Sequence, residues 1–368
     1  MASRSPSWSH TLLSLIFATT PVLPSLVINV APTTPQPYIL PNLAGAAVDF
    51  GGLIIRTVVP NDTSDGTLSL LMVNSGPGAA GLIHYHKEVE AFYTLKGSVQ
   101  VWHNSDVGRQ ASANDFVLLA PGNNHTYRPN DLDFQLALCM APGGIDEFFA
   151  QAGNPYSSNS PFDPLDNSKL NVPKVLSLMP KFNIIPNPRL PINVDWTNGT
   201  TADGLDTWHV ANQTLPSSPG TAYFVSSNRG PKYLQRRSST ITAALTTGKQ
   251  TNNKLSVATV SIPPSTRPRN SVSSPIHQAF MITEGALQLE INGEVNQLIF
   301  GDVAFIPNGT QFRYWSTVGF TKFVVWAGGN GGLADALIQD SENWGFAVWP
   351  IDRTSGEDEE TLREQEKS

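Results

Sequence analysis

A pattern of glycine and aspartate occurs twice in this chain at nearly the same spacing. Gly97 is followed by Asp115-Phe-Val-Leu-Leu-Ala-Pro-Gly122, and Gly285 is followed by Asp302-Val-Ala-Phe-Ile-Pro-Asn-Gly309. The second copy of the first glycine lies 188 residues along the chain, and the second copy of the aspartate lies 187 residues along. A nearly constant offset with these residues in register indicates a duplicated unit. We therefore expect two similar domains.

Short runs within each copy alternate apolar and polar residues, which is the pattern of half-buried β-strands. Gly97-Ser-Val-Gln-Val-Trp102 is one such run, and Ala286-Leu-Gln-Leu-Glu-Ile291 is another, followed by the hairpin signal Asn-Gly. Glycine and proline number 29 each and charged residues make up only 14%, a composition that favours short strands joined by turns. The sequence predicts an all-β protein with two β-barrel domains.

Composition divides the chain into five parts. The two copies occupy residues 25–153 and 221–350. Between them, residues 154–220 are rich in proline, serine and asparagine, and we expect a long irregular connection. Residues 351–368 are interpreted as a solvated acidic tail, and residues 1–24 as a leader.

The leader has the order of a secretory signal peptide, with Arg4 ahead of a short apolar stretch and small residues after it. We therefore expect a secreted protein, and a disordered leader on a cytosolic protein is the alternative. The apolar stretch is too short to span a membrane. Cys139 is the only cysteine, so no intramolecular disulfide can form. The Asn-X-Thr pattern predicts glycosylation at Asn61, Asn198, Asn212 and Asn308. Asn124 also fits the pattern but lies too close to the candidate site described next.

Charge argues against one class of partner. The net charge of -7 and the sequence pI of about 5.5 provide no basic stripe, so nucleic acid is not an expected partner. A membrane is not expected either, because the apolar stretch near the N-terminus is too short to span one. Neutral or weakly acidic small molecules remain possible ligands.

The first copy also contains H-x-H-x3-E-x6-G, and a further histidine follows its second glycine. Residues two apart on a strand point to one face, so two histidines at this spacing can share an ion. On a straight strand Glu90 would lie about 20 Å from His84, too far to share an ion. The chain must therefore turn near residues 87–89 to bring Glu90 back toward the histidines. The candidate ligands are His84, His86, Glu90 and His125. Three imidazoles and a carboxylate suit a divalent transition ion. The alternative is a pair of hydrogen-bonded or solvated histidines.

The second copy lacks these residues. The equivalent positions hold Val272, Ser274, Gln278 and Phe312, so we expect no metal in the C-terminal barrel. His277 lies one position out of register. His10, His103 and His209 have no partners in the pattern and are interpreted as structural or exposed.

The ligand pattern is that of the cupin motifs, and further segments resemble the fungal bicupin quercetin 2,3-dioxygenases. These segments are Tyr223-Phe-Val-Ser-Ser-Asn-Arg-Gly-Pro-Lys-Tyr-Leu234, Trp208-His209, Gly301-Asp-Val-Ala-Phe-Ile-Pro-Asn-Gly309, Glu90-Ala-Phe-Tyr93 and Pro142-Gly-Gly144. The resemblance implies two jelly-roll cupin domains, with a metal in the first held by the four residues above. Copper is expected first, with iron, manganese, nickel and zinc as alternatives. The fungal enzymes carry one more residue between the second histidine and the glutamate than this chain does.

The resemblance implies that the chain opens the heterocyclic ring of a flavonol such as quercetin with O2 and releases CO. Glu90 would take the proton of the flavonol hydroxyl, which requires a pKa close to neutrality. Strand parity and depth in the barrel place an apolar wall beside the ligands, made by Phe92, Tyr127, Leu136 and Met140. Ordinary core packing is the alternative for the two aromatic residues. The expected partners are a small aromatic substrate and O2, with a homodimer as one assembly to test.

Other functions stay open at this point. A metal-dependent cupin could oxidise, isomerise or cyclise another phenolic or polyketide metabolite. A non-catalytic bicupin, either metal-binding or a binder or storage protein, is a third class. Binders and storage proteins usually lose the metal ligands in both halves, whereas the first half of this chain keeps them. A pirin-like nuclear cofactor fits less well with a secretory leader. Release of CO from quercetin would distinguish a flavonol dioxygenase from these other functions.

Overall fold

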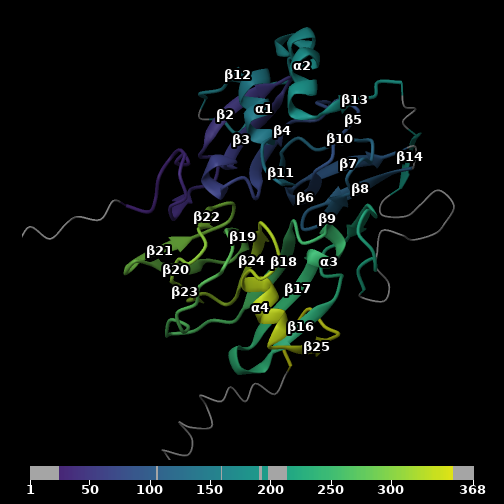
Figure 1. The fold of residues 1–368 in the computed structure, drawn as a ribbon. Coiled ribbons are helices and arrows are strands. Elements are labelled where there is room, and N and C mark those ends of the chain that lie inside the picture. The colour runs from purple at the N-terminus through teal and green to yellow at the C-terminus, as the bar shows by residue number, and fades with distance from the viewer. Residues whose placement is uncertain (1–24, 105–106, 159, 190–192, 198–213, 351–368) are drawn as a thin grey trace, which may run out of the picture.

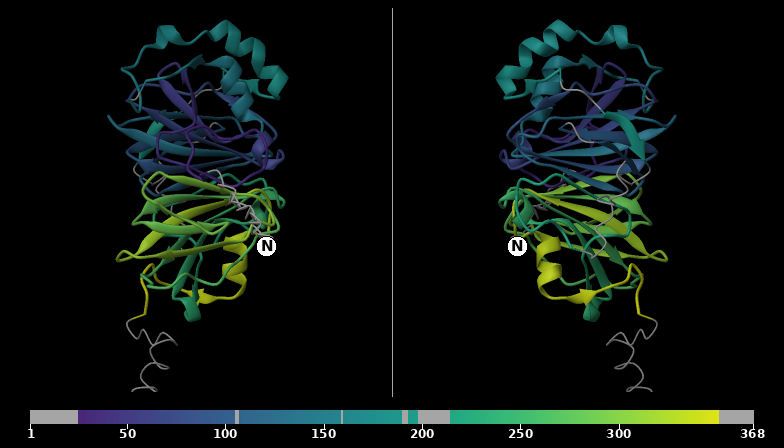
Figure 2. Two further views of the ribbon diagram at one scale, coloured as in Figure 1. Left: turned by 90° about the vertical axis from the view of Figure 1, so that its left-hand side faces the viewer. Right: turned by 90° about the vertical axis from the view of Figure 1, so that its right-hand side faces the viewer.

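The computed structural model describes residues 25–350, apart from 105–106, 159, 190–192 and 198–213. Two β-sandwich domains are stacked on one another, the purple-to-teal N-terminal half above the green-to-yellow C-terminal half (Figures 1 and 2). Each domain packs two sheets, so the prediction of an all-β chain with two barrels is confirmed. The leader, the acidic tail, Asn198, Asn212 and the pair Trp208-His209 lie outside the described residues.

The N-terminal domain packs an eight-stranded sheet against a six-stranded sheet. In order across the larger sheet the strands are β12 (Asn154–Pro155), β2 (Ala46–Phe50), β3 (Leu53–Val59), β4 (Ser69–Ser75), β11 (Phe134–Ala141), β6 (Val89–Lys96), β9 (Phe116–Leu119) and β15 (Tyr223–Val225). Across the smaller sheet they are β13 (Ile185–Pro186), β5 (His84–Tyr85), β10 (His125–Pro129), β7 (Ser98–His103), β8 (Val107–Ser112) and β14 (Asn193–Thr197).

The C-terminal domain packs an eight-stranded sheet against a three-stranded sheet. The larger sheet has the order β1 (Tyr38–Leu40), β22 (Val303–Ile306), β19 (Gln278–Glu284), β24 (Thr321–Ala327), β18 (Ser256–Ile262), β17 (Thr240–Thr246), β16 (Lys232–Gln235) and β25 (Glu342–Trp344). The smaller sheet has the order β21 (Glu294–Leu298), β20 (Leu287–Ile291) and β23 (Phe312–Ser316).

The two domains repeat one topology. In the first, β6 lies between β9 and β11, and in the second, β19 lies between β22 and β24. The register repeats as well, because Glu90 opposes Met140 and the equivalent Gln278 opposes Ala327. The duplication predicted from the sequence is therefore confirmed at the level of residue pairs.

Backbone conformation explains the first repeated glycine. Gly97 has φ +67° and Gly285 has φ +75°, values that residues with a side chain rarely adopt. A Cβ atom at either position would also clash with a backbone carbonyl oxygen, that of Asp133 or of Phe320. The turn from β6 to β7 and the turn from β19 to β20 therefore require glycine for two reasons.

The repeated aspartates tie the halves of the chain together. Each accepts a 2.8 Å hydrogen bond from the backbone N–H three residues before it, which closes a turn. The other carboxylate oxygen accepts a bond from the opposite half of the sequence. The donor is the N–H of Ser227 for Asp115, at 2.7 Å, and the N–H of Asn42 for Asp302, at 2.8 Å.

Two short strands cross between the halves. β1 pairs with β22 in the C-terminal sheet, and β15 pairs with β9 in the N-terminal sheet. Each lies just before the residue that bonds the motif aspartate of the domain it joins. By sequence, β1 falls within residues 25–153 and β15 within residues 221–350. A division at those boundaries therefore separates each strand from the sheet it completes.

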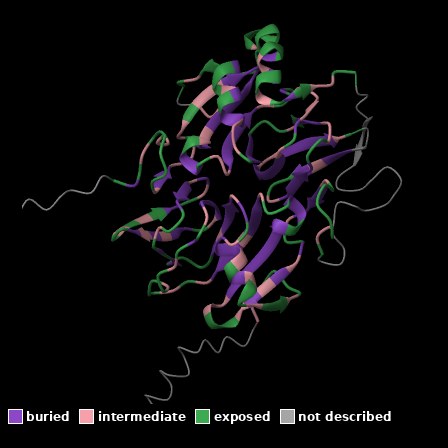
Figure 3. Ribbon diagram, in the orientation of Figure 1, coloured by how far each residue is buried: buried purple, intermediate pink, exposed green. Residues whose placement is uncertain are grey.

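Three apolar cores result from this arrangement, one inside each domain and one between them. Alternate residues of β6 contribute to different cores, so that Phe92 belongs to the N-terminal interior and Tyr93 to the core between the domains. The rings of Tyr38 and Phe305 stack there at 5.5 Å. Figure 3 shows the buried residues along the central strands of both domains. A shared core of this kind holds the two barrels as one body.

Helices are few. α1 (Ile145–Ala152) follows β11, and α4 (Leu333–Gln339) follows β24 at the equivalent place. The others are α2 (Val172–Leu178), α3 (Gly248–Thr251), and the 3-10 helices η1 (Asp62–Ser64), η2 (Asn167–Lys169), η3 (Met179–Phe182) and η4 (Arg236–Ser238). The predicted irregular connection thus contains α2, two 3-10 helices and three short strands, elements too short to show a periodicity. Among the described residues, no helix combines the length and the apolar composition needed to cross a membrane.

Candidate metal centre

The H-x-H pattern lies at the start of the smaller N-terminal sheet. His84 begins β5, His86 follows that strand, and the chain bends at residues 87–88. β6 then begins, and Glu90 is its second residue. The turn predicted from the reach of a ligand is therefore present, and it returns Glu90 toward the histidines.

His125 enters from a third strand and is held by backbone bonds. It opposes His84 in the antiparallel pairing of β10 with β5. The N–H of Gly122 donates a 2.7 Å hydrogen bond to the carbonyl of His86. Gly122 has φ +79°, which a turn residue with a side chain would adopt only with strain. The placement of the three histidines therefore depends on main-chain pairing.

The four side chains converge. Their candidate ligand atoms lie within 4.8 Å of one another. Among the described residues, these four form the group of His, Cys, Asp or Glu side chains that could hold a metal ion. The ring centroid of His125 lies 4.4 Å from that of His84 and 4.9 Å from that of His86. Ligands at about 2.0–2.2 Å from one ion lie at most about 4.4 Å apart, so a contraction of a few tenths of an ångström would suffice.

Backbone carbonyls fix which ring nitrogens are available. The Nδ1 atom of His84 lies 2.7 Å from the carbonyl oxygen of Leu82, and Nδ1 of His125 lies 2.9 Å from that of Asn123. A carbonyl can only accept, so both Nδ1 atoms carry the proton. The Nε2 lone pairs are then free to bind a metal, which is the usual support for a metal-ligating histidine.

Burial and charge act in opposite directions within the group. Burial, with the neighbouring His125, lowers the pKa of His84 to about 3, so this ring is neutral. Burial also favours a neutral His86, but the hydrogen bond to Glu90 and its charge raise the His86 pKa overall. For Glu90, burial alone would raise the pKa, yet His125 and His86 hold it well below its usual range. These surroundings therefore favour an ionised Glu90 and oppose the near-neutral pKa expected for a base.

The donor set fits a divalent transition ion. His125 Nε2 is buried and lies 2.7 Å from Glu90 Oε2, but it makes no hydrogen bond of acceptable geometry. His86 Nε2 lies 3.1 Å from the same oxygen. The nitrogen lone pairs and the carboxylate thus point to one place, and not every one of these atoms has a hydrogen-bond partner. A shared metal ion would satisfy all of them.

The residues predicted to form an apolar wall all lie in the core of the same barrel. Phe92 and Tyr127 meet edge to face with ring centroids 5.3 Å apart. Leu136 and Met140 are buried on β11, and Met140 opposes Glu90 in the sheet. Phe92 and Tyr127 thus contact one another in the interior that holds the ligands.

Sequence reasoning missed the contribution of the connection to this site. β13 pairs with β5, so that Pro186 opposes His84. Asn187 then donates its backbone N–H to the carbonyl of Ile83 at 2.9 Å and its side-chain amide to Asn124 at 3.0 Å. A two-residue strand that contains proline has no sequence signature.

Two predicted glycosylation sites lie among the described residues. Asn308 is exposed in the turn before β23. Asn61 is half-buried, and its amide lies 3.5 Å from a carboxylate oxygen of Glu147.

Comparison with known proteins places the chain. No protein-family model matches it. The quercetin 2,3-dioxygenase of Aspergillus japonicus is 30% identical over 347 residues, which cover 89% of this chain and 99% of that protein. The chain belongs to the quercetin 2,3-dioxygenase family. A quercetin 2,3-dioxygenase of Bacillus subtilis (strain 168) is 26% identical over 125 residues, which are 33% of this chain and 36% of that protein. Among solved structures, protein Ylba from E. coli matches with a TM-score of 0.50 at 8% identity over 82% of this chain and 93% of that one, a likeness of fold alone.

Membership of the quercetin 2,3-dioxygenase family confirms the resemblance stated from the motifs. The chain is a dioxygenase-like oxidoreductase on a two-domain cupin fold, with a group of three histidines and one glutamate that could hold one metal ion.

Proposed function

We propose that this chain is a metal-dependent flavonol dioxygenase that opens the heterocyclic ring of a substrate such as quercetin and releases CO. The observation that carries the proposal is the converging group of three histidines and one glutamate in a chain that aligns with 99% of a quercetin 2,3-dioxygenase. One dioxygen molecule is consumed for each CO released, and both of its oxygen atoms enter the phenolic ester that remains.

The ion would be held by His84, His86, His125 and Glu90, and copper is our first assignment because of the family. When bound, it supplies Lewis acidity that lowers the pKa of the flavonol hydroxyl and helps to pass electron density from substrate to dioxygen.

Glu90 is the proposed acceptor of the hydroxyl proton. Glu90 is 3% exposed, so its carboxylate is shielded from bulk water. Because its pKa is low, the carboxylate is ionised and ready to accept, but it is a weak base. Proton transfer therefore depends on a matching fall in the pKa of the substrate hydroxyl. Glu90 Oε2 faces the Nε2 atoms of His86 and His125, where the ion would be held, so Oε1 is the oxygen left to receive the proton.

The apolar wall suits a flat aromatic substrate. Phe92, Tyr127, Leu136 and Met140 would contact its rings and exclude water. Burial raises the pKa of the Tyr127 phenol well above its usual range, so this hydroxyl stays protonated and serves as a neutral donor.

We also infer from the leader that the protein is secreted, with Asn308 as its most accessible glycosylation site among the described residues. Intact mass of the protein purified from its native host medium, before and after deglycosylation, tests both points.

Oxygen uptake and CO release with a panel of flavonols test the proposed reaction. We expect equal amounts of O2 consumed and CO formed, and no reaction with a dihydroflavonol of the same hydroxylation. Oxygen uptake without CO would instead assign the chain to oxidation of another phenolic class. Conversion without oxygen would assign it to isomerisation or cyclisation.

A further inference from the structure

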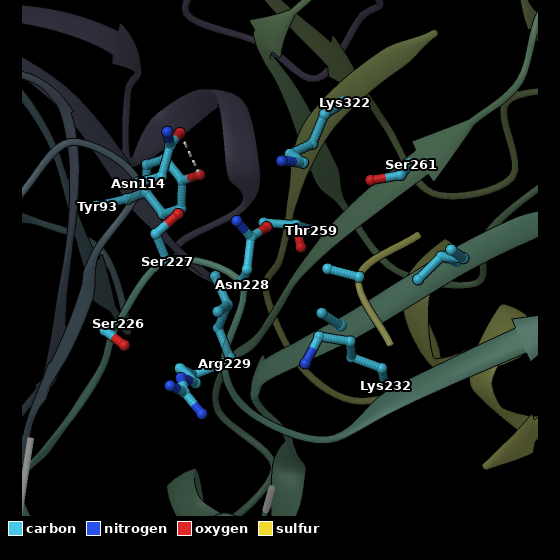
Figure 4. A pocket seen from close by; sticks show the side chains of 14 residues that line it. Tyr93, Asn114, Ser226, Ser227, Asn228, Arg229, Lys232, Thr259, Ser261 and Lys322 are labelled. Atoms are coloured by element: carbon cyan, nitrogen blue, oxygen red, sulfur yellow. Dashed lines mark hydrogen bonds between the residues drawn. The ribbon is translucent and has the colours of Figure 1, made fainter. Parts of the chain in front are cut away.

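A pocket lies between the two domains, on the face of β6 opposite to Glu90. Its N-terminal side includes Tyr93 and Asn114, joined by a 3.0 Å hydrogen bond from the phenol to the amide oxygen (Figure 4). Its C-terminal side comes from residues 226–229 and from strands β16, β17, β18 and β24. Three of its side chains are cationic, and none of the described residues that line it is acidic.

Lys232 is the member of this group that needs explanation. It is the first residue of β16, where alternation directs Lys232 and Leu234 inward, and it is only 5% exposed. Its ammonium donates one hydrogen bond, at 3.3 Å, to the carbonyl of Gly230, although it has three N–H donors. None of the ion pairs between described residues includes it. A buried ammonium without a counter-charge is costly, so this position favours an anionic partner.

Of the other two cationic side chains, one has an acidic partner and the other has none among the described residues. Lys322 is already paired with Glu284 at 2.7 Å. Arg229 is exposed at the rim, and no ion pair in the described part of the chain involves it. Its charge, after burial, lowers the pKa of Lys232, so the two cations are close enough to repel one another. Figure 4 shows Arg229 and Lys232 on one side of the pocket, Lys322 on the opposite side, and Asn228 and Thr259 between them.

The size of the pocket restricts its occupant. The free space is about 30 Å³. One water molecule requires about 10–15 Å³ on this measure, so there is room for a group the size of two or three waters. A flavonol or any other ring compound is too large. The hydroxyls of Thr259 and Ser261 and the amide of Asn228 add neutral donors around this space.

We propose that this pocket binds a small oxyanion, either inorganic phosphate or the carboxylate group of a small acid, through Lys232 and Arg229. The site is independent of the metal centre and of the reaction proposed for it. It would stabilise the contact between the domains, because its lining comes from both halves of the chain.

Thermal unfolding of the metal-loaded full chain tests the proposal, with phosphate or acetate compared against chloride at the same ionic strength. We expect a saturable rise in Tm with one of the two oxyanions. Lys232→Met should weaken that oxyanion's binding by at least about tenfold, because it removes a charged donor. Arg229→Gln should weaken it less, and Lys174→Met, an exposed lysine far from the pocket in sequence, should respond as the parent does.

The tighter of the two probes identifies the source of the oxyanion. A rise in Tm that Lys232→Met retains in full arises elsewhere, including at the metal centre, and overturns the proposal. An equal response of the parent to chloride and to both oxyanions overturns it as well. Arg229→Gln keeps the test decisive if Lys232→Met does not fold, since Arg229 is exposed: a response unchanged in Arg229→Gln would then reject the site.

Discussion

The N-terminal and C-terminal barrels hold equivalent strands with equivalent bonds and fill their interiors differently. The N–H of Gly122 bonds the carbonyl of His86 at 2.7 Å, and the N–H of Gly309 bonds that of Ser274 at 2.8 Å. The register that sets His125 opposite His84 sets Phe312 opposite Val272. The scaffold for a metal centre is thus present twice, and only the side chains in the first copy could use it.

Packing fills the second interior. Phe312 lies 5.5 Å from Phe280, and Phe280 lies 5.2 Å from Phe323, measured between ring centroids. Gln278, at the position of Glu90, accepts a 3.0 Å hydrogen bond from the N–H of Leu333. The C-terminal barrel therefore uses these positions for aromatic contact and for holding the start of α4.

The aromatic pair proposed as substrate wall is common to both barrels. Phe92 and Tyr127 lie 5.3 Å apart, and the equivalent Phe280 and Tyr314 lie 6.4 Å apart with a similar interplanar angle, 70° against 73°. A pair repeated in a barrel without the ligands has a packing role first. What the N-terminal interior has alone is the ligand group, with Leu136 where the other barrel has Phe323.

The largest effect is expected from copying the second barrel into the first. His84→Val introduces the residue found at the equivalent position and removes one of three imidazoles. We expect metal content to fall to background and turnover to fall by more than about 100-fold, the upper range for a group that only supports a ligand. Metal analysis and oxygen uptake measure this. His277→Gln, in the other barrel, should retain both, and full activity in His84→Val would remove His84 from the site.

Glu90→Gln separates metal binding from proton transfer. We expect most of the metal to be retained and turnover to fall by about 10²–10⁴-fold, the usual contribution of a positioned base. The reverse exchange at the equivalent position, Gln278→Glu, should leave turnover unchanged. Turnover of Glu90→Gln within a few-fold of the parent would show that Glu90 is not the proton acceptor.

The repeated aspartates provide a matched pair of stability tests. Asp115→Ala and Asp302→Ala each leave two backbone N–H groups without an acceptor. Each should lower the free energy of unfolding by about 1–3 kcal/mol, measured by urea denaturation. A loss of stability in only one of the two variants would contradict the structural equivalence of Asp115 and Asp302.

The smallest effect concerns the repeated aromatic pair. Phe92→Leu and Phe280→Leu should each lower the free energy of unfolding by about 1 kcal/mol, since both shrink a buried ring. Only Phe92→Leu should also raise KM for a flavonol, with metal content unchanged. An unchanged KM would assign Phe92 to packing alone.

The sequence predicted the parts that repeat or that carry a motif. The duplicated barrels and the meeting of His84, His86, Glu90 and His125 followed from spacing, since side chains two apart on a strand share a face. The exchange of β1 and β15 did not, because strands of three residues show no alternation. Nothing in the sequence around Asp115 and Asp302 indicated that each carboxylate accepts a hydrogen bond from the opposite half of the chain.

Long-range contacts account for the remaining differences. β13 pairs with β5, although the two strands are about a hundred residues apart in sequence. The Ile-Pro sequence of β13 predicts no strand. The pKa of Glu90 depends on two histidines whose distances follow only from the fold. The inward position of Lys232 likewise follows from the pairing of β16 rather than from its neighbours in sequence.

Metal stoichiometry of the unmodified chain tests the central claim most directly. Protein produced in metal-replete medium, purified without chelators and analysed by native mass spectrometry with elemental analysis, should contain one transition ion per chain, held by the group in the N-terminal barrel. Two ions per chain would contradict the difference between the barrels. No bound ion would contradict the metal centre itself.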